Sequence, residues 1–157
     1  MRTILALAGT AAIVFLIAAQ FAGPDEDNGR IDPAQTIEAQ TKMPLNVAAI
    51  LGRACQDCHS ERTEWRWYGH IAPMAWLQMA DVYAGRQHMN FSTWGQYSTA
   101  QQDRRLLGMC VLARRRSMPL WYYRFVHYSQ ATLSDSDLNT LCGWTEAERA
   151  RLKQSGQ

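Results

Sequence analysis

Two cysteines and a histidine are spaced for covalent chemistry in the segment Cys55-Gln56-Asp57-Cys58-His59. Residues three apart lie on one side of a helical turn, so both thiols can reach the same ligand. The Cys-x-x-Cys-His pattern is typical of c-type haem attachment, in which each thiol forms a thioether and the histidine ligates the iron. The motif therefore predicts one covalent haem c, attached at Cys55 and Cys58, with His59 as the proximal ligand.

Three other interpretations of this motif are possible in principle. A thioredoxin-like dithiol needs a βαβ setting, and the chain has no convincing strand. A plain disulfide between Cys55 and Cys58 is uncommon at this spacing. A zinc site needs two further ligands at compact spacing. The remaining candidates form no second Cys-x-x-Cys or His-x₃₋₅-His unit: Cys110, Cys142, His70, His88 and His127.

The second axial ligand is expected to be a methionine, since sulfur opposite histidine raises the reduction potential. Met118 is favoured because Pro119 stiffens the loop that presents its sulfur, well downstream of His59. Met118 as a plain core residue is the alternative. Met74 is the next methionine, and bis-histidine ligation through His70, His88 or His127 also stays open.

Several residues are expected to support the site. Outside the cytoplasm a disulfide between Cys110 and Cys142 is the natural interpretation, with two buried thiols as the alternative. The run Arg114 to Arg116 could pair with haem propionates, although a solvated helix end is favoured. Aromatic residues and a proline are candidates for the pocket wall or for ordinary core packing: Trp65, Trp67, Tyr68, Pro73, Trp76, Phe91 and Trp94.

The elements that must position these residues are predicted to be helices, so the fold class is all-α, a cytochrome-c-like domain of several short helices around one haem. Apolar residues at 3–4 spacing predict a short helix that runs from Pro44 directly into Cys55. A second helix is expected at 73–84, with Gly85 as its stop. A third is expected at 100–115, and the residues predicted to face the core are Leu106, Leu107, Cys110, Val111 and Ala113. A last helix is expected after Ser134, and it contains Leu138, Leu141, Cys142 and Leu152. Loops are expected at 90–95 and in the aromatic stretch after Pro119.

The N-terminus differs in composition from the rest of the chain. Residues 3–23 carry no charge and are long enough to span a bilayer, so 1–23 is predicted to be a signal peptide or, preferably, an uncleaved anchor helix. Residues 24–42 are polar and predicted to be a flexible tether. Residues 43–157 are the predicted haem domain. The domain is then extracytoplasmic or periplasmic and tethered to the inner membrane. The formal net charge of +2 argues against a nucleic-acid partner.

A series of short segments carries a resemblance to a known family: Cys55–Ser60, Thr63–Tyr68, Ile71–Trp76, Gly85–Ser92, Met118–Leu120, His127 and Leu133–Ser134. In this order along the chain, they resemble bacterial haem-binding domain proteins with a cytochrome-c-like motif. The resemblance runs from about Pro44 to Trp144 and implies a monohaem c-type domain with Cys55, Cys58, His59 and Met118 in the roles given above.

Three functions follow from these features. Electron transfer through a His/Met-ligated haem is the first, and it requires no acid–base residue. The rival is a ligand sensor or peroxidase-like enzyme with an open or displaceable sixth site, assisted by His70 or His88. The third is an accessory haem subunit held in a larger membrane complex. The redox partners are not identified by the sequence.

Overall fold

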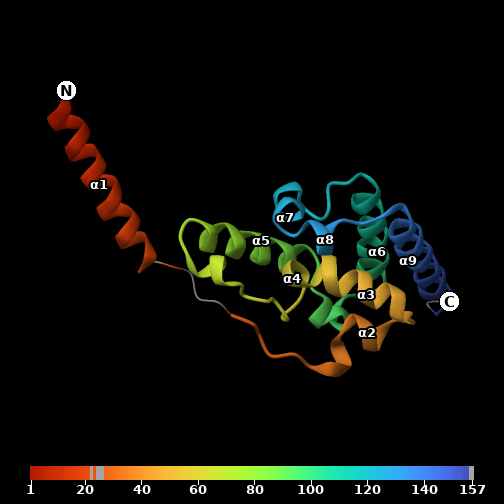
Figure 1. The fold of residues 1–157 in the computed structure, drawn as a ribbon. Helices are drawn as coiled ribbons and strands as arrows, with labels where there is room; N and C mark the ends of the chain where they lie inside the picture. The colour runs from red at the N-terminus through yellow and green to blue at the C-terminus, as the bar shows by residue number, and fades with distance from the viewer. Residues whose placement is uncertain (22, 24–26, 156–157) are drawn as a thin grey trace.

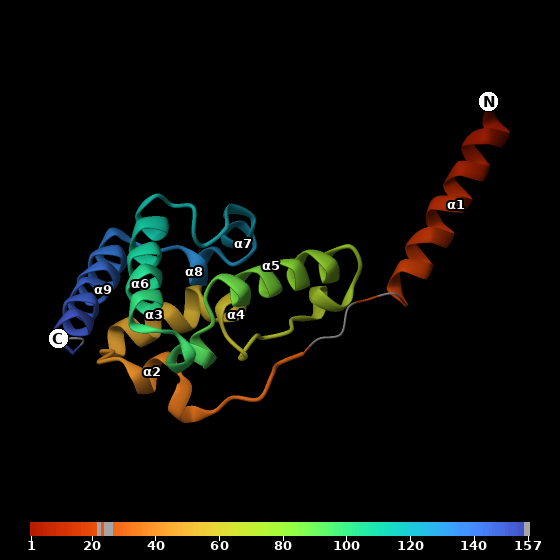
Figure 2. The same cartoon turned by 180° about the vertical axis from the view of Figure 1, so that it is seen from behind.

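The computed structural model describes residues 1–21, 23 and 27–155, and within these ranges it contains helices and loops but no strand. The all-α prediction is confirmed. Helix α1 (Arg2–Gln20) extends away from the rest of the domain (Figures 1 and 2). With a mean hydropathy of 2.1 it is long and apolar enough to cross a membrane. Only Ala19 on this helix is buried, so its apolar surface has almost no cover within the described chain.

The segment before the first core helix is more ordered than the flexible tether predicted for residues 24–42. It contains a 3₁₀ turn, η1 (Pro33–Gln35), and a one-turn helix, α2 (Ile37–Gln40). Ile37 is 1% exposed and belongs to the hydrophobic core. A single buried isoleucine produces no periodic pattern, which is why the sequence did not indicate this packing. The domain therefore begins before residue 43; residues 24–26 lie outside the described ranges.

The motif follows directly from a core helix, as predicted. Helix α3 (Leu45–Ala54) and the one-turn helix α4 (Gln56–His59) are separated only by Cys55. The predicted inner face of α3 is buried at Val47, Ile50, Leu51 and Ala54. A 3₁₀ turn, η2 (Trp67–His70), then leads to α5.

Helix α5 (Met74–His88) continues past Gly85, where the sequence predicted a stop. Gly85 serves a packing role instead, described below. The predicted loop after α5 contains a further 3₁₀ segment, η3 (Phe91–Gln96), begun by the Asn90 side chain, which accepts a hydrogen bond from the Ser92 amide.

Two long helices form the other side of the domain. Helix α6 (Thr99–Arg114) begins with a capping box between Ser98 and Gln101, and α9 (Asp135–Ser155) follows Ser134, whose hydroxyl accepts from the Asp137 amide. The four residues predicted to face inward from α9 are buried. On α6, Met109 is buried while Leu107 is 44% exposed. The prediction that Leu107 faces the core is therefore wrong. The apolar residues of α6 are too irregularly spaced to show from the sequence which side of the helix is buried.

The aromatic stretch after Pro119 is not a loop. It forms α7 (Trp121–Val126) and α8 (Tyr128–Ala131), two helices too short to show a period. The hydrophobic core lies between α3, α6 and α9, with η3 contributing Trp94, which is completely buried. Trp94 thus packs helices rather than lining a pocket.

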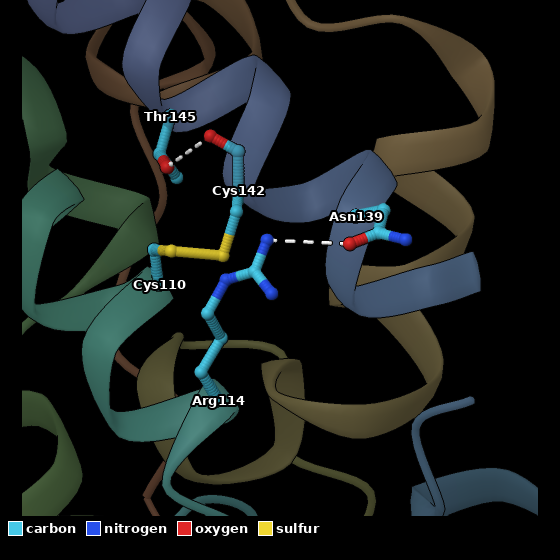
Figure 3. The surroundings of a disulfide bond; sticks show 5 residues. All are labelled: Cys110, Arg114, Asn139, Cys142 and Thr145. Atoms are coloured by element: carbon cyan, nitrogen blue, oxygen red, sulfur yellow. Dashed lines mark hydrogen bonds between the residues drawn. A yellow bond between two sulfur atoms is a disulfide. The ribbon is translucent and has the colours of Figure 1, made fainter. Parts of the chain in front are cut away.

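A disulfide joins Cys110 on α6 to Cys142 on α9, the pair that the sequence favoured, with the Cα atoms 4.9 Å apart (Figure 3). One turn further along α6, Arg114 donates to the Asn139 side chain at 3.2 Å. These links fix α6 against α9 and close the chain segment that contains Met118 into a loop.

Candidate functional site

Two backbone carbonyls hold the histidine of the motif. His59 Nδ1 lies 3.0 Å from the carbonyl oxygen of Gly85 and 2.9 Å from that of Met89. Only a protonated nitrogen can donate to carbonyls, so Nδ1 carries the hydrogen and Nε2 keeps its lone pair. Burial lowers the pKa of His59, although the two carbonyl hydrogen bonds oppose this shift. The ring is therefore neutral near pH 7, which is the form that binds a metal.

Helix α5 approaches the motif closely because residue 85 has no side chain. A Cβ atom on Gly85 would lie 2.2 Å from the carbonyl oxygen of Cys58 and 3.1 Å from its Cβ. Any other residue would push α5 away from α4, and the Gly85 carbonyl would then lose its contact with His59. The sequence predicted Gly85 only as the end of a helix, which is wrong, because α5 continues to His88.

The two motif cysteines are free thiols in the structure. Burial raises the pKa of Cys55 and of Cys58 to about 12, so both thiols are protonated near neutral pH. Reactive dithiols and zinc-binding cysteines instead depend on thiolates that form easily. Within the described ranges there is also no cluster of three or more His, Cys, Asp or Glu side chains suited to a metal ion.

A cavity of about 550 Å³ opens beside the motif. Its volume is within the range of about 300–1,000 Å³ typical of small-molecule sites. All four predicted ligand residues line it: Cys55, Cys58, His59 and Met118. Most of the remaining wall is apolar and comes from α6, the loop after it and α9, including Met109, Leu112, Ala113, Pro119, Leu120 and Leu141. Segments far apart in the sequence thus converge on one apolar space.

Of the residues predicted to form the pocket wall, the structure brings only Phe91 to this cavity. The centroid of its ring lies 5.9 Å from that of His59. Apart from Trp94 in η3, the others are near η2 and the beginning of α5, and Trp67 is 74% exposed. With a rise of about 1.5 Å per residue, Met74 lies roughly 16 Å along α5 from Gly85, and it does not line this cavity. The misplaced residues are Trp65, Trp67, Tyr68, Pro73 and Trp76.

The alternative axial ligands are also separated from the motif histidine. Met74 and His127 line a second, smaller cavity of about 60 Å³, together with Tyr68. His70 lines neither cavity. His88 does line the large cavity, but it lies one helical turn beyond Gly85, whose carbonyl holds His59. It is therefore on the same side of the cavity as His59.

Tyrosines that the sequence analysis did not single out surround the motif. Tyr123 donates to Asp57 Oδ2 at 2.8 Å, so a residue between the two cysteines is fixed by α7. Tyr122 donates to Asp81 Oδ1, also at 2.8 Å. Burial raises the pKa of Asp81, an effect that the Tyr122 hydrogen bond opposes. The pair Tyr122-Tyr123 follows Met118 closely in sequence, but which carboxylate each contacts depends on tertiary packing.

Arg105 is the cationic side chain of the large cavity. Its guanidinium lies 3.8 Å from the centroid of the Tyr97 ring, and Nη1 reaches the Gln101 carbonyl at 3.4 Å. Its Nε is buried without a hydrogen-bond partner in the described part of the chain. An orphaned buried guanidinium nitrogen beside an apolar cavity suits a carboxylate ligand.

The arginine run considered for that role lies elsewhere. Arg114, Arg115 and Arg116 are exposed at the end of α6 and do not line the cavity. Arg116 pairs with Asp135 at 2.7 Å and donates to the Leu133 carbonyl. This arrangement is that of a solvated helix end.

Comparison with known proteins supplies one match. The haem-binding domain family matches residues 14–147, which is most of the chain. No curated protein and no solved structure matches.

Proposed function

Because the chain belongs to the haem-binding domain family, we propose that it attaches one haem c covalently and uses it to transfer single electrons. Cys55 and Cys58 would form the thioethers, His59 would be the proximal ligand and Met118 the distal ligand. The observation that carries this proposal is that all four side chains line the same cavity of about 550 Å³.

The residues of this cavity fit a haem. The walls are largely apolar, so they exclude water and favour the less charged reduced state. The Nε2 lone pair of His59 is available, and the ring cannot rotate without losing its carbonyl contacts. Arg105 offers a cation to a propionate carboxylate. A bound haem would supply a metal centre that gains and loses one electron, and the chain would bind it, orient it and exclude water.

Electron transfer is favoured over the sensor or peroxidase-like alternative by the position of the histidines. The enzyme considered above would need an open sixth position with His70 or His88 beside it. His88 is on the His59 side of the cavity and His70 does not reach the wall, whereas Met118 is available as a sixth ligand. We therefore propose a non-enzymatic carrier whose redox partners dock transiently.

We further propose that the domain lies outside the cytoplasm. Helix α1 is apolar and long enough to anchor the chain in a membrane. The Cys110–Cys142 disulfide is typical of an oxidising compartment. Both features support a periplasmic domain tethered to the inner membrane.

The test is the absorption spectrum of the protein matured with c-haem attachment machinery, recorded for the unmutated chain, Met118→Ala and Met109→Ala. Met109 is a matched control because it is a methionine that also lines the cavity. We expect a low-spin spectrum with a sulfur-to-iron charge-transfer band that is lost only in Met118→Ala. Retention of haem after denaturation, and its loss in Cys55→Ser with Cys58→Ser, would establish the covalent bonds.

Two results would contradict the proposal. If the band is lost in Met109→Ala and kept in Met118→Ala, the distal ligand is Met109. If the unmutated protein is high-spin and binds carbon monoxide readily, the sixth position is open, and the carrier function is wrong.

A further inference from the structure

Large apolar side chains are gathered on one face of the domain, beside the end of the N-terminal helix. From η2, the turn after it and α5 the face includes Trp67, Ile71, Met74 and Leu77, and from α7 and α8 it includes Trp121, Phe125, Val126 and Tyr128. All are exposed, with Phe125 at 83%, Trp67 at 74% and Trp121 at 71%. Soluble monomers rarely expose contiguous apolar patches of this kind unless they bind something. We call these eight residues the aromatic face.

Hydrogen bonds between half-buried polar groups hold the two halves of this face together. Tyr122 of α7 donates to Asp81 of α5 at 2.8 Å. The Tyr68 hydroxyl lies 2.6 Å from Nε2 of His127. The small cavity between the halves is lined by Met74, Leu77 and Val126 from both sides. The face is therefore a fixed surface of the fold, and both views show α5 and α7 next to each other (Figures 1 and 2).

Helix α1 ends at the edge of this face. Gln20, its last residue, accepts a hydrogen bond from the Ala72 amide at 3.0 Å and donates to the Ala72 carbonyl at 3.5 Å. Ala72 directly follows Ile71 of the aromatic face. Figure 1 shows the end of α1 near the beginning of α5. An apolar helix that crosses a bilayer ends at the membrane–water interface, the depth at which tryptophan and tyrosine are enriched.

We propose that the aromatic face docks on the lipid bilayer that α1 spans, with its tryptophans and Phe125 in the interfacial region. This proposal rests on the proposed role of α1 as an anchor. The apolar parts of Trp67, Trp121 and Phe125 leave water on docking, which is favourable in proportion to the area removed.

Docking would also fix the direction in which the attachment motif faces. Asp57 and Cys58 line the small cavity directly behind Met74, Leu77 and Val126. With the aromatic face on the bilayer, the motif would be close to the membrane surface. The electron-transfer partner would then be a redox group held at that surface.

Photo-cross-linking in lipid tests this inference. The full chain, matured with haem, is reconstituted into vesicles of phosphatidylethanolamine and phosphatidylglycerol, with p-benzoylphenylalanine in place of Phe125, Trp121 or Leu45. Leu45 is the matched control because it is an apolar residue of α3, 90% exposed, that is not part of the aromatic face. We expect lipid adducts, measured by mass spectrometry, to be several-fold more abundant at positions 125 and 121 than at position 45.

Equal yields at the three positions would overturn the proposal, as would a chain that does not float with the vesicles. Cross-linked dimers in place of lipid adducts would also overturn it, in favour of an interface between copies. The haem absorbance of each sample separates this proposal from the proposed function. If the chain carries covalent haem but shows no excess of lipid adducts at positions 125 and 121, the docking proposal is wrong and the proposed haem attachment stands. If the excess of lipid adducts is found on a chain without haem, the proposed haem attachment is wrong and the docking proposal stands.

Discussion

Replacement of Gly85 by alanine tests the packing that holds His59. The new Cβ would lie 2.2 Å from the Cys58 carbonyl oxygen, about 1.2 Å short of the 3.4 Å at which ordinary contact begins. The opposing atoms belong to the backbone of α4, so no side chain can rotate away. Helix α5 must move instead, and the hydrogen bond between His59 Nδ1 and the Gly85 carbonyl is expected to lengthen.

Two opposing terms set the magnitude of this effect. Alanine is favoured over glycine inside a helix by about 0.5–1 kcal/mol. Overpacking costs typically about 1–3 kcal/mol, or more where rigid groups collide. We therefore expect Gly85→Ala to lower the free energy of unfolding by roughly 1–2 kcal/mol. In a chain of this size, each kcal/mol shifts Tm by about 2–4 °C.

The assay is thermal and denaturant unfolding of the haem-loaded protein, with its absorption spectrum recorded in parallel. Gly143→Ala is the control because a Cβ there meets nothing within 4 Å on another helix, α9. The control should be neutral or stabilised by up to about 1 kcal/mol. If Gly85→Ala is as stable as the control and its haem spectrum is unchanged, α5 does not hold His59 as described.

Three further substitutions test other features of the structure. Joint replacement of Cys110 and Cys142 by serine should lower the free energy of unfolding by about 3–4 kcal/mol, since the disulfide closes a 32-residue separation, as measured by denaturant unfolding. The hydrogen bond from Arg149 lowers the pKa of Asp103. The pair therefore stabilises the fold at pH values above the ordinary carboxyl pKa of about 4. This contribution is lost as the pH falls through the lowered pKa of the folded state. Asp103→Asn should therefore cost about 1 kcal/mol at pH 7 and little at pH 3, as measured by unfolding at both pH values. Arg105→Gln should lower the midpoint potential by tens of millivolts in a redox titration, since a lost cation favours the oxidised state.

Each of these predictions has an outcome that contradicts it. If the unmutated protein is equally stable with the Cys110–Cys142 disulfide intact and with this disulfide reduced, the disulfide contributes nothing. A cost of Asp103→Asn that is the same at both pH values would mean that ionisation of this carboxyl is irrelevant. Arg104, the exposed neighbour of Arg105, supplies the control substitution Arg104→Gln. Equal potentials for the two glutamine variants would exclude a special role for Arg105.

Features that depend on local spacing could be predicted from the sequence alone. Three residues of one short segment define the motif at Cys55, Cys58 and His59, and the helices that flank it show apolar residues at 3–4 spacing. Ser98 and Ser134 mark helix starts because a cap depends on residues only three apart. The apolar N-terminal helix was equally evident from composition. These signals lie within one or two helical turns, so no tertiary contact is needed to detect them.

Which distant residues share the site depends instead on how the helices pack. Trp65, Trp67 and Trp76 are near the motif in sequence, yet α5 leads away from the cavity and leaves them at its far end. Arg105 reaches the cavity from α6 because the core on that helix includes Met109 and excludes Leu107. Gly85 acts through a contact with the backbone of Cys58, 27 residues earlier in the chain. Sequence patterns report the period of a helix, whereas the neighbour that each side chain meets depends on how helices cross, and that is a property of the whole packed chain.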